Sequence, residues 1–107
     1  MDCSVNYEYE KKYLELLKDI VLKTFSDIEC KIFLFGSRAG NSYSRSSDYD
    51  IGIENISKKD FMMKKREVES EVEESIIPHK VDLINFDEAK EDFRKIAYKN
   101  VVVWKNI

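Results

Sequence analysis

The sequence predicts an α/β fold in which a small mixed sheet of about four strands is covered by helices. Two observations lead to this prediction. Short runs of aromatic and β-branched residues are typical of strands, and they alternate with longer segments whose apolar residues recur every three or four positions, as in helices. The predicted order is helix, strand, strand, helix, strand, helix, strand. No repeat or linker divides the chain, so we expect one domain over residues 1–107.

The first half of the chain contains one predicted helix and two predicted strands. Residues 7–25 place their apolar side chains on one helical face. Residues 31–35 form an apolar run that predicts a buried strand, and the Gly- and Ser-rich residues 36–47 predict a loop. In residues 48–54, Tyr49, Ile51 and Ile53 alternate with Asp48 and Asp50, which predicts a strand with one apolar face.

The second half predicts two helices and two strands. Ser57 is a predicted N-cap, and Pro78 is expected to end the helix that it begins. Residues 81–86 and 101–104 predict strands, and between them Asp87 is expected to cap a short helix. The predicted inner residues of the longer helix are Phe61, Val68, Val72 and Ile76, and the shorter helix is expected to run through Phe93, Ile96 and Ala97.

Composition limits the classes of function. The net charge is −3, from 18 basic and 21 acidic residues, and such a balance lacks the basic surface typical of direct nucleic-acid binding. No run approaches the roughly 18 apolar residues of a membrane span, and the polar N-terminus is unlike a signal peptide. We therefore expect a cytoplasmic protein that binds no membrane, with Cys3 and Cys30 as reduced thiols.

Three aspartates are the candidate catalytic and metal-binding residues. Asp48 and Asp50 stand two positions apart, so their carboxylates point to the same face of a strand, where a divalent cation would relieve their repulsion. Oxygen ligands favour Mg²⁺, or Mn²⁺, over Zn²⁺. Asp82 interrupts an apolar strand, and it would join the pair if the two strands are neighbours. The alternatives are a solubilising pair and a sheet-edge Asp82 bound to a Lys or Arg.

The loop after the first strand is the candidate phosphate-binding element. Gly36 and Ser37 allow backbone N–H groups and a hydroxyl to approach an anion, and Arg38 can add charge-assisted hydrogen bonds to phosphate oxygens. Ser47 either orients this loop or caps it. Taken alone, Gly-Ser also marks ordinary turns, so the loop gains its meaning from the aspartates that follow it.

The spacing of these residues resembles a known signature. Gly36-Ser37, ten residues, and then Asp48-Tyr49-Asp50 are similar to the G-S-x10-D-x-D motif of the DNA polymerase β-like nucleotidyltransferases. The wider text F-G-S-R-A-G-N-S-Y-S-R-S-S-D-Y-D-I resembles the minimal nucleotidyltransferase (MNT) branch, and Asp82-Leu83 matches the later strand that carries the third carboxylate. The chain departs from that branch at Gly40-Asn41, where Arg-Gly is usual. The resemblance implies a polymerase β-like palm.

The resemblance also implies an activity and a partner. Members of the family use two Mg²⁺ ions, here held by Asp48, Asp50 and Asp82, to transfer a nucleoside monophosphate from an NTP to a hydroxyl. MNT proteins are antitoxins that AMPylate a tyrosine of a helical HEPN ribonuclease toxin with ATP. The chain has no room for a separate acceptor-binding domain, so we expect the hydroxyl to come from such a partner. Two alternatives are a non-catalytic module that neutralises its partner by contact, and a small-molecule nucleotidyltransferase subunit. The oligomeric state, homomeric or heteromeric, stays open.

Overall fold

The predicted order of helices and strands is confirmed. The computed structural model describes residues 3–36, 49–78 and 80–107, and of residues 3–10 only the backbone. None of the helices in these ranges has both the length and the apolar character of a membrane span. The elements are α1 (Cys3–Thr24), β1 (Lys31–Phe35), β2 (Tyr49–Glu54), α2 (Lys58–Glu73), β3 (Val81–Asn85), α3 (Glu91–Ala97) and β4 (Val101–Lys105).

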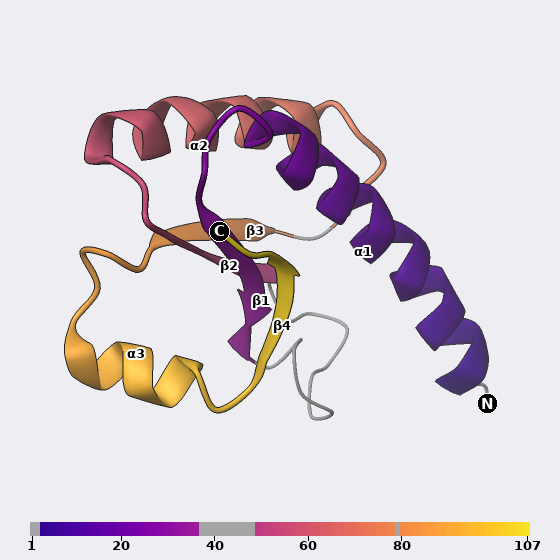
Figure 1. Ribbon diagram of the computed structural model, residues 1–107. Helices are drawn as coiled ribbons and strands as arrows, with labels where there is room; N and C mark the ends of the chain where they lie inside the picture. Colours follow the sequence, from indigo (N-terminus) through magenta and orange to yellow (C-terminus); the bar gives the residue numbers. More distant parts are fainter. Residues whose placement is uncertain (1–2, 37–48, 79) are drawn as a thin grey trace.

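The strands form a mixed sheet in the order β3-β2-β1-β4. β1 pairs antiparallel with both β2 and β4, whereas β2 and β3 run parallel, joined by α2. Helices α1 and α2 cover one face of the sheet, and α3 lies on the other face (Figure 1). The predicted fold class, a mixed sheet covered by helices, is therefore confirmed.

Side-chain alternation in the strands separates two apolar cores. The larger one lies between the sheet and helices α1 and α2, and β2 contributes Tyr49, Ile51 and Ile53 to it. The smaller one lies on the α3 face and consists of Phe33, Phe35, Phe86 and Ala97. We call the three phenylalanines of this second core the aromatic floor. Asp50 and Gly52 alternate with the β2 residues of the larger core, so they belong to the face of the aromatic floor.

Two polar contacts hold helix ends in place. The Ser57 hydroxyl accepts a hydrogen bond from the backbone N–H of Asp60 at 3.1 Å, which confirms Ser57 as the N-cap of α2. After α1, Lys105 Nζ donates to the carbonyl oxygens of Phe25 at 2.9 Å and Ile28 at 2.7 Å. The same two carbonyls also accept the backbone N–H groups of Ile28 and Cys30, so the lysine adds a charged contact that joins the turn after α1 to β4.

Two predictions about the helices are wrong. Ile76 is 58% exposed because α2 ends at Glu73, and Ile77 enters the core instead. Asp87 does not cap α3; its carboxylate accepts the backbone N–H of Ile56 at 2.9 Å, and the helix begins at Glu91.

In α3 only Ala97 is buried, and Phe93 and Ile96 are exposed. The short helix therefore rests on the sheet through Ala97, while the Phe93 ring lies 5.6 Å from that of Phe86 and keeps its other side exposed.

Candidate active site

Two of the three predicted carboxylates meet on the sheet. Asp50 and Asp82 are direct register partners in the parallel pairing of β2 with β3, so their strands lie about 4.8 Å apart at this point. Both residues are half-buried, and both lie on the face of the aromatic floor. The condition under which Asp82 would join the pair, that its strand lies beside the Asp50 strand, is met, and β3 is also an edge strand of the sheet.

Gly36 brings the start of the candidate phosphate loop against Asp50. It follows Phe35, whose register partner in β2 is Asp50, and its φ of 78° lies in the left-handed region that favours glycine. A Cβ atom at this position would lie 2.8 Å from Asp50 Oδ2 and 3.6 Å from Asp50 Cγ. The backbone of Gly36 therefore abuts the carboxylate, and no larger residue fits there without displacing it.

The remaining predicted site residues lie outside the described residues. These are Ser37, Arg38, Ser47 and Asp48. The structure thus brings together Gly36, Asp50 and Asp82. Asp48 keeps its predicted role on the sequence alone.

The aromatic floor is the part of the site that the sequence prediction missed. Phe33 contacts Phe86 edge to face at a centroid distance of 4.8 Å, and Phe35 contacts Phe86 in the same way at 5.0 Å. Gly52, the register partner of Phe33, leaves the space that these rings occupy. Phe35 lies directly across the strands from Asp50, so the floor supports the backbone that positions the carboxylate. A glycine within an otherwise apolar strand was the available signal, because such a glycine often marks a close approach.

The donor set at this site fits a hard divalent cation. Asp50 and Asp82 offer carboxylate oxygens on one face, and Gly36 keeps side-chain bulk away from Asp50 Oδ2. Within the described ranges no group of three His, Cys, Asp or Glu residues gathers as a metal site, and Asp48 falls outside them. The described part of the chain thus supplies two of the three predicted ligands.

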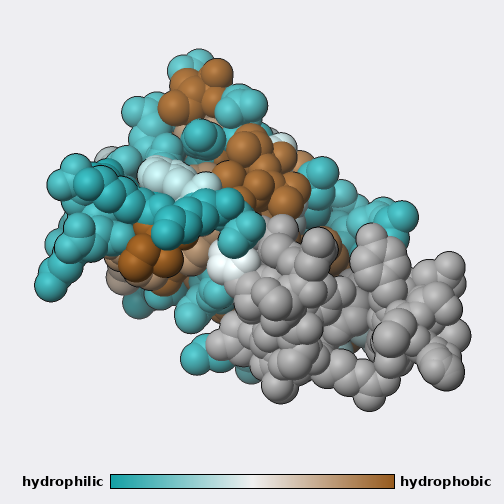
Figure 2. All heavy atoms as spheres, turned by 90° about the horizontal axis from the view of Figure 1, so that it is seen from below, coloured by the Kyte–Doolittle hydropathy of each residue, from teal (hydrophilic) through white to brown (hydrophobic). Residues whose placement is uncertain are grey.

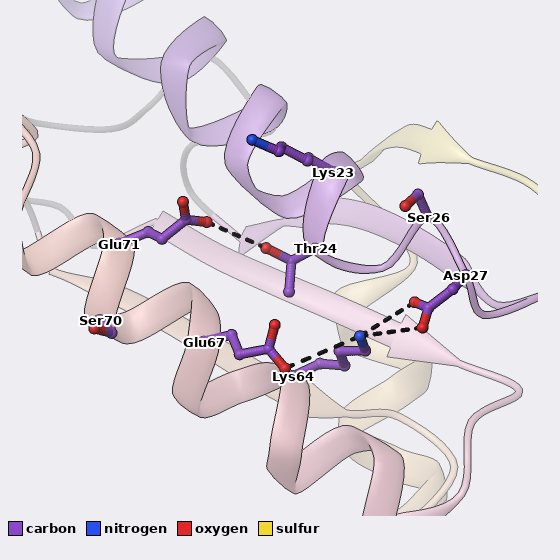
Figure 3. A pocket seen from close by; sticks show the side chains of 8 residues that line it. All are labelled: Lys23, Thr24, Ser26, Asp27, Lys64, Glu67, Ser70 and Glu71. Atoms are coloured by element: carbon purple, nitrogen blue, oxygen red, sulfur yellow. Dashed lines mark hydrogen bonds and ion pairs between the residues drawn. The ribbon is translucent and has the colours of Figure 1, made fainter.

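A separate polar groove lies between α1 and α2, on the opposite face of the sheet. It has a volume of about 520 Å³, and Figure 3 shows its side chains projecting from the end of α1, the following turn and α2. Lys64 Nζ lies 3.2 Å from Asp27 Oδ1 and 4.0 Å from Glu67 Oε2, and Thr24 donates to Glu71 at 3.4 Å. Because these charges pair with one another, the groove is a polar contact between two helices, remote from the aspartates.

Comparison with known proteins identifies the family. Residues 12–106 match the model of the polymerase β nucleotidyltransferase family. The chain is 31% identical over 96 residues to a probable protein adenylyltransferase, MntA, of Haemophilus influenzae, which covers 90% of this chain and 82% of the relative.

Solved structures share the fold. One is a toxin–antitoxin structure with AMP-PNP (TM-score 0.62, 18% identity, covering 84% of this chain and 73% of that chain). Another is a complex of the tri-AMPylated HEPN toxin of Shewanella oneidensis with its MNT antitoxin (TM-score 0.60, 16% identity, covering 87% and 72%). A third is an MntA–HpeT mutant with two Asp-to-Glu substitutions (TM-score 0.62, 16% identity, covering 84% and 73%). With the paired aspartates in place, the chain belongs to the polymerase β nucleotidyltransferase family, in the minimal branch that includes the adenylyltransferase MntA.

Proposed function

We propose that this protein is an Mg²⁺-dependent adenylyltransferase that acts as the antitoxin of a HEPN-type ribonuclease toxin. It moves the AMP group of ATP to a tyrosine hydroxyl of that toxin. The observation that carries the proposal is the register pairing of Asp50 with Asp82, next to Gly36, on the face that α1 and α2 leave uncovered. Two carboxylates side by side, next to a glycine that begins the candidate phosphate loop, support a metal-dependent phosphate chemistry on this face.

The relatives support the acceptor and the nucleotide. The Haemophilus relative is a probable protein adenylyltransferase, one solved relative holds the ATP analogue AMP-PNP, and another pairs an MNT antitoxin with an AMPylated HEPN toxin. In the MntA–HpeT mutant, the two aspartates replaced by glutamates stand two positions apart. Asp48 and Asp50 have the same spacing.

Three aspartates are assigned as metal ligands in this proposal. Asp48, Asp50 and Asp82 would hold two Mg²⁺ ions, with Mn²⁺ as a substitute, through carboxylate oxygens. Bound divalent ions neutralise phosphate charge and make a nearby hydroxyl a better nucleophile. The carboxylates repel one another in the absence of a cation, so we expect cation binding to raise the thermal stability of the protein.

The nucleotide is assigned to the loop that begins at Gly36. Its backbone N–H groups and the Ser37 hydroxyl hold the triphosphate, Arg38 pairs with phosphate oxygens, and Ser47 holds the end of the loop. Because Gly36 has no side chain, the start of this loop lies directly against Asp50, which would place phosphates held by the loop beside the carboxylates assigned to the cations.

The transfer is a single displacement at the α-phosphorus. The tyrosine oxygen bonds to this phosphorus as its bond to the bridging oxygen breaks, and pyrophosphate leaves with that electron pair. The phenolic proton passes to a carboxylate, which we assign to Asp82. The loop that begins at Gly36 keeps the reacting phosphate in place, and Asp50 would hold a cation that offsets the negative charge of that phosphate.

Labelled ATP tests the proposal. Wild-type protein, Mg²⁺ and α-phosphate-labelled ATP are incubated with the helical protein of the adjoining gene, identified by its R-x4-6-H motif. We expect label on that protein. With Asp50→Asn or Asp82→Asn, we expect the amount of label to fall by a factor of roughly 100 or more. Asp19→Asn, an exposed aspartate on α1, is the matched control and keeps full activity.

The same assay separates the alternatives. Protection of cells by the double variant Asp48→Ala, Asp50→Ala would refute enzymatic neutralisation and favour inhibition by contact. Label that appears on a small molecule and not on the partner would favour the small-molecule transferase.

A further inference from the structure

An exposed apolar patch lies on the same face of the sheet as the candidate active site. It is formed by Phe93 and Ile96 of α3, Tyr98 just after it, and Val103 of β4, which are between 41% and 68% exposed. We call these four residues the α3–β4 patch. Figure 2 looks at the molecule from the α3 side and shows apolar atoms grouped among hydrophilic ones. Exposed apolar residues grouped in this way mark interaction sites more often than isolated ones do.

The patch is fixed to the aromatic floor. The Phe93 ring lies 5.9 Å from that of Phe35, edge to face, and the Tyr98 ring lies 5.8 Å from that of Phe33. Because the floor is buried, the exposed rings are held by a rigid support. Such a surface loses little conformational entropy when a partner covers it.

Strand register ties the patch to the aspartates. Across the sheet, Phe35 is the register partner of both Asp50 and Val101, and Asp50 is the partner of Asp82. In the next row of the same face, Phe33 is the partner of Val103. A protein that presents a hydroxyl to the aspartates approaches this face of the sheet, and the α3–β4 patch is an exposed apolar surface on the same face.

The rim of the patch is basic although the protein as a whole is acidic. The chain carries a net charge of −3, yet residues 94–99, at the end of α3 and just after it, hold three basic residues and no acidic one, and the acidic Asp87 and Glu88 precede the helix. Residues 90–99 hold Lys90, Arg94, Lys95 and Lys99 against Glu91 and Asp92. A partner surface that complements the patch is therefore apolar at its centre and acidic at its edge. A second copy of this chain fits poorly, since a twofold contact would place these lysines against one another.

We infer that the α3–β4 patch is the docking surface for the protein that carries the acceptor tyrosine. This inference rests on the proposed function and adds the surface and its chemistry. The partner contributes an apolar surface bordered by Asp or Glu side chains. Docking there places it on the aspartate face, within reach of the row that contains Asp50 and Asp82.

A charge placed on the patch tests the inference. Ile96→Glu alters the most exposed residue of the patch, so the fold should tolerate it, and Ile76→Glu is the matched control, 58% exposed and outside this patch. The probe is the helical protein of the adjoining gene, made as a ribonuclease-inactive variant. Calorimetry measures its binding, label transfer measures activity, and a fluorescent ATP analogue measures nucleotide binding without the partner.

We expect Ile96→Glu to weaken partner binding at least tenfold while nucleotide binding stays unchanged. Label transfer falls at low partner concentration and recovers at high concentration, since the change acts on KM and leaves kcat in place. Ile76→Glu stays within about twofold of wild type. Lys99→Glu also weakens binding, and added salt reduces the difference between Lys99→Glu and wild type.

Three results would overturn the inference. The first is that Ile96→Glu and Ile76→Glu bind the partner with the same affinity. Another is self-association of the wild type that Ile96→Glu abolishes, since a second copy would then occupy the patch. The third is a label transfer by Ile96→Glu that stays below the wild-type level even at the highest partner concentration. If the wild type binds the partner through the patch but transfers no label to it, the proposed function fails and the docking surface stands.

Discussion

Gly52→Ala is the sharpest test of how the aromatic floor is built. Gly52 lies in the middle of β2, opposite Phe33. A Cβ atom added there would lie 2.5 Å from both Cε2 and Cζ of Phe33 and 2.7 Å from Cε1 of Phe86. Carbon atoms in contact normally lie about 3.5–4.0 Å apart, so the two rings must move by about 1 Å.

The size of the effect follows from how little room those rings have. Phe33 and Phe86 are almost completely buried, and overpacking in a dense core costs about 1–3 kcal/mol. Two rings are displaced, which favours the upper part of that range, while replacing a strand glycine by alanine returns about 0.5–1 kcal/mol of chain entropy. We expect a net loss of about 2 kcal/mol in the free energy of unfolding, or a Tm lower by about 8–16 °C.

Urea unfolding followed by circular dichroism measures this loss, with an unchanged m-value as the check on two-state behaviour. Val102→Ile adds a methyl group at an exposed position of β4 and serves as the control, within about 0.5 kcal/mol of wild type. In a Phe33→Leu background the contacts to Cε2 and Cζ are gone, so Gly52→Ala should cost about 1 kcal/mol less. An equal cost in both backgrounds would refute the steric argument.

Three further changes test other parts of the structure. Gly36→Ala places a methyl group 2.8 Å from Asp50 Oδ2, so label transfer should fall roughly 100-fold while circular dichroism stays native; half the activity retained would contradict this. Lys105→Met removes a charged donor from two carbonyls that keep their backbone donors, so the free energy of unfolding should fall by about 1–2 kcal/mol in urea; an unchanged midpoint would show that this contact does not stabilise the fold. Burial raises the pKa of the Cys30 thiol, so in Cys3→Ser the native protein should react with iodoacetamide far more slowly than the unfolded one, and equal rates would exclude burial.

Local patterns were sufficient to predict the strands and the aspartate face. The alternation of Tyr49, Ile51 and Ile53 with Asp50 requires that the aspartate lie opposite the main core, and the structure confirms it. Asp82 was informative for a related reason. A charged residue in an apolar strand needs a special environment, and here it shares a row of the sheet with Asp50.

The errors concern contacts between segments far apart in the sequence. Asp87 has the composition of an N-cap, but it instead holds the N–H of Ile56, which is 31 residues away. In α3, a period of three or four residues shows that one face is apolar but not that this face packs on the sheet. Ala97 is buried, Phe93 packs one side of its ring on Phe86 and Ile96 is 68% exposed, and no local pattern distinguishes these three positions.

The polar groove between α1 and α2 makes a prediction about acid stability. A hydrogen bond from Lys64 lowers the pKa of Asp27 below its ordinary value of 3.8. A lowered pKa means that folding favours the charged carboxylate, so the pair stabilises the fold above pH 3.8 and this contribution is lost as the pH falls through the folded value. Because Asp27 is exposed, solvent screening keeps the contribution small.

Asp27→Asn removes the titrating group and isolates this contribution. We expect the wild type to be slightly more stable than Asp27→Asn at neutral pH, and the urea midpoints of the two proteins to converge as the pH is lowered to about 2. In a Lys64→Met background the substitution should have a smaller effect at neutral pH, since the donor is gone. A difference that widens on acidification would show that the charged carboxylate destabilises the fold, and the groove would then no longer be explained as a paired contact between helices.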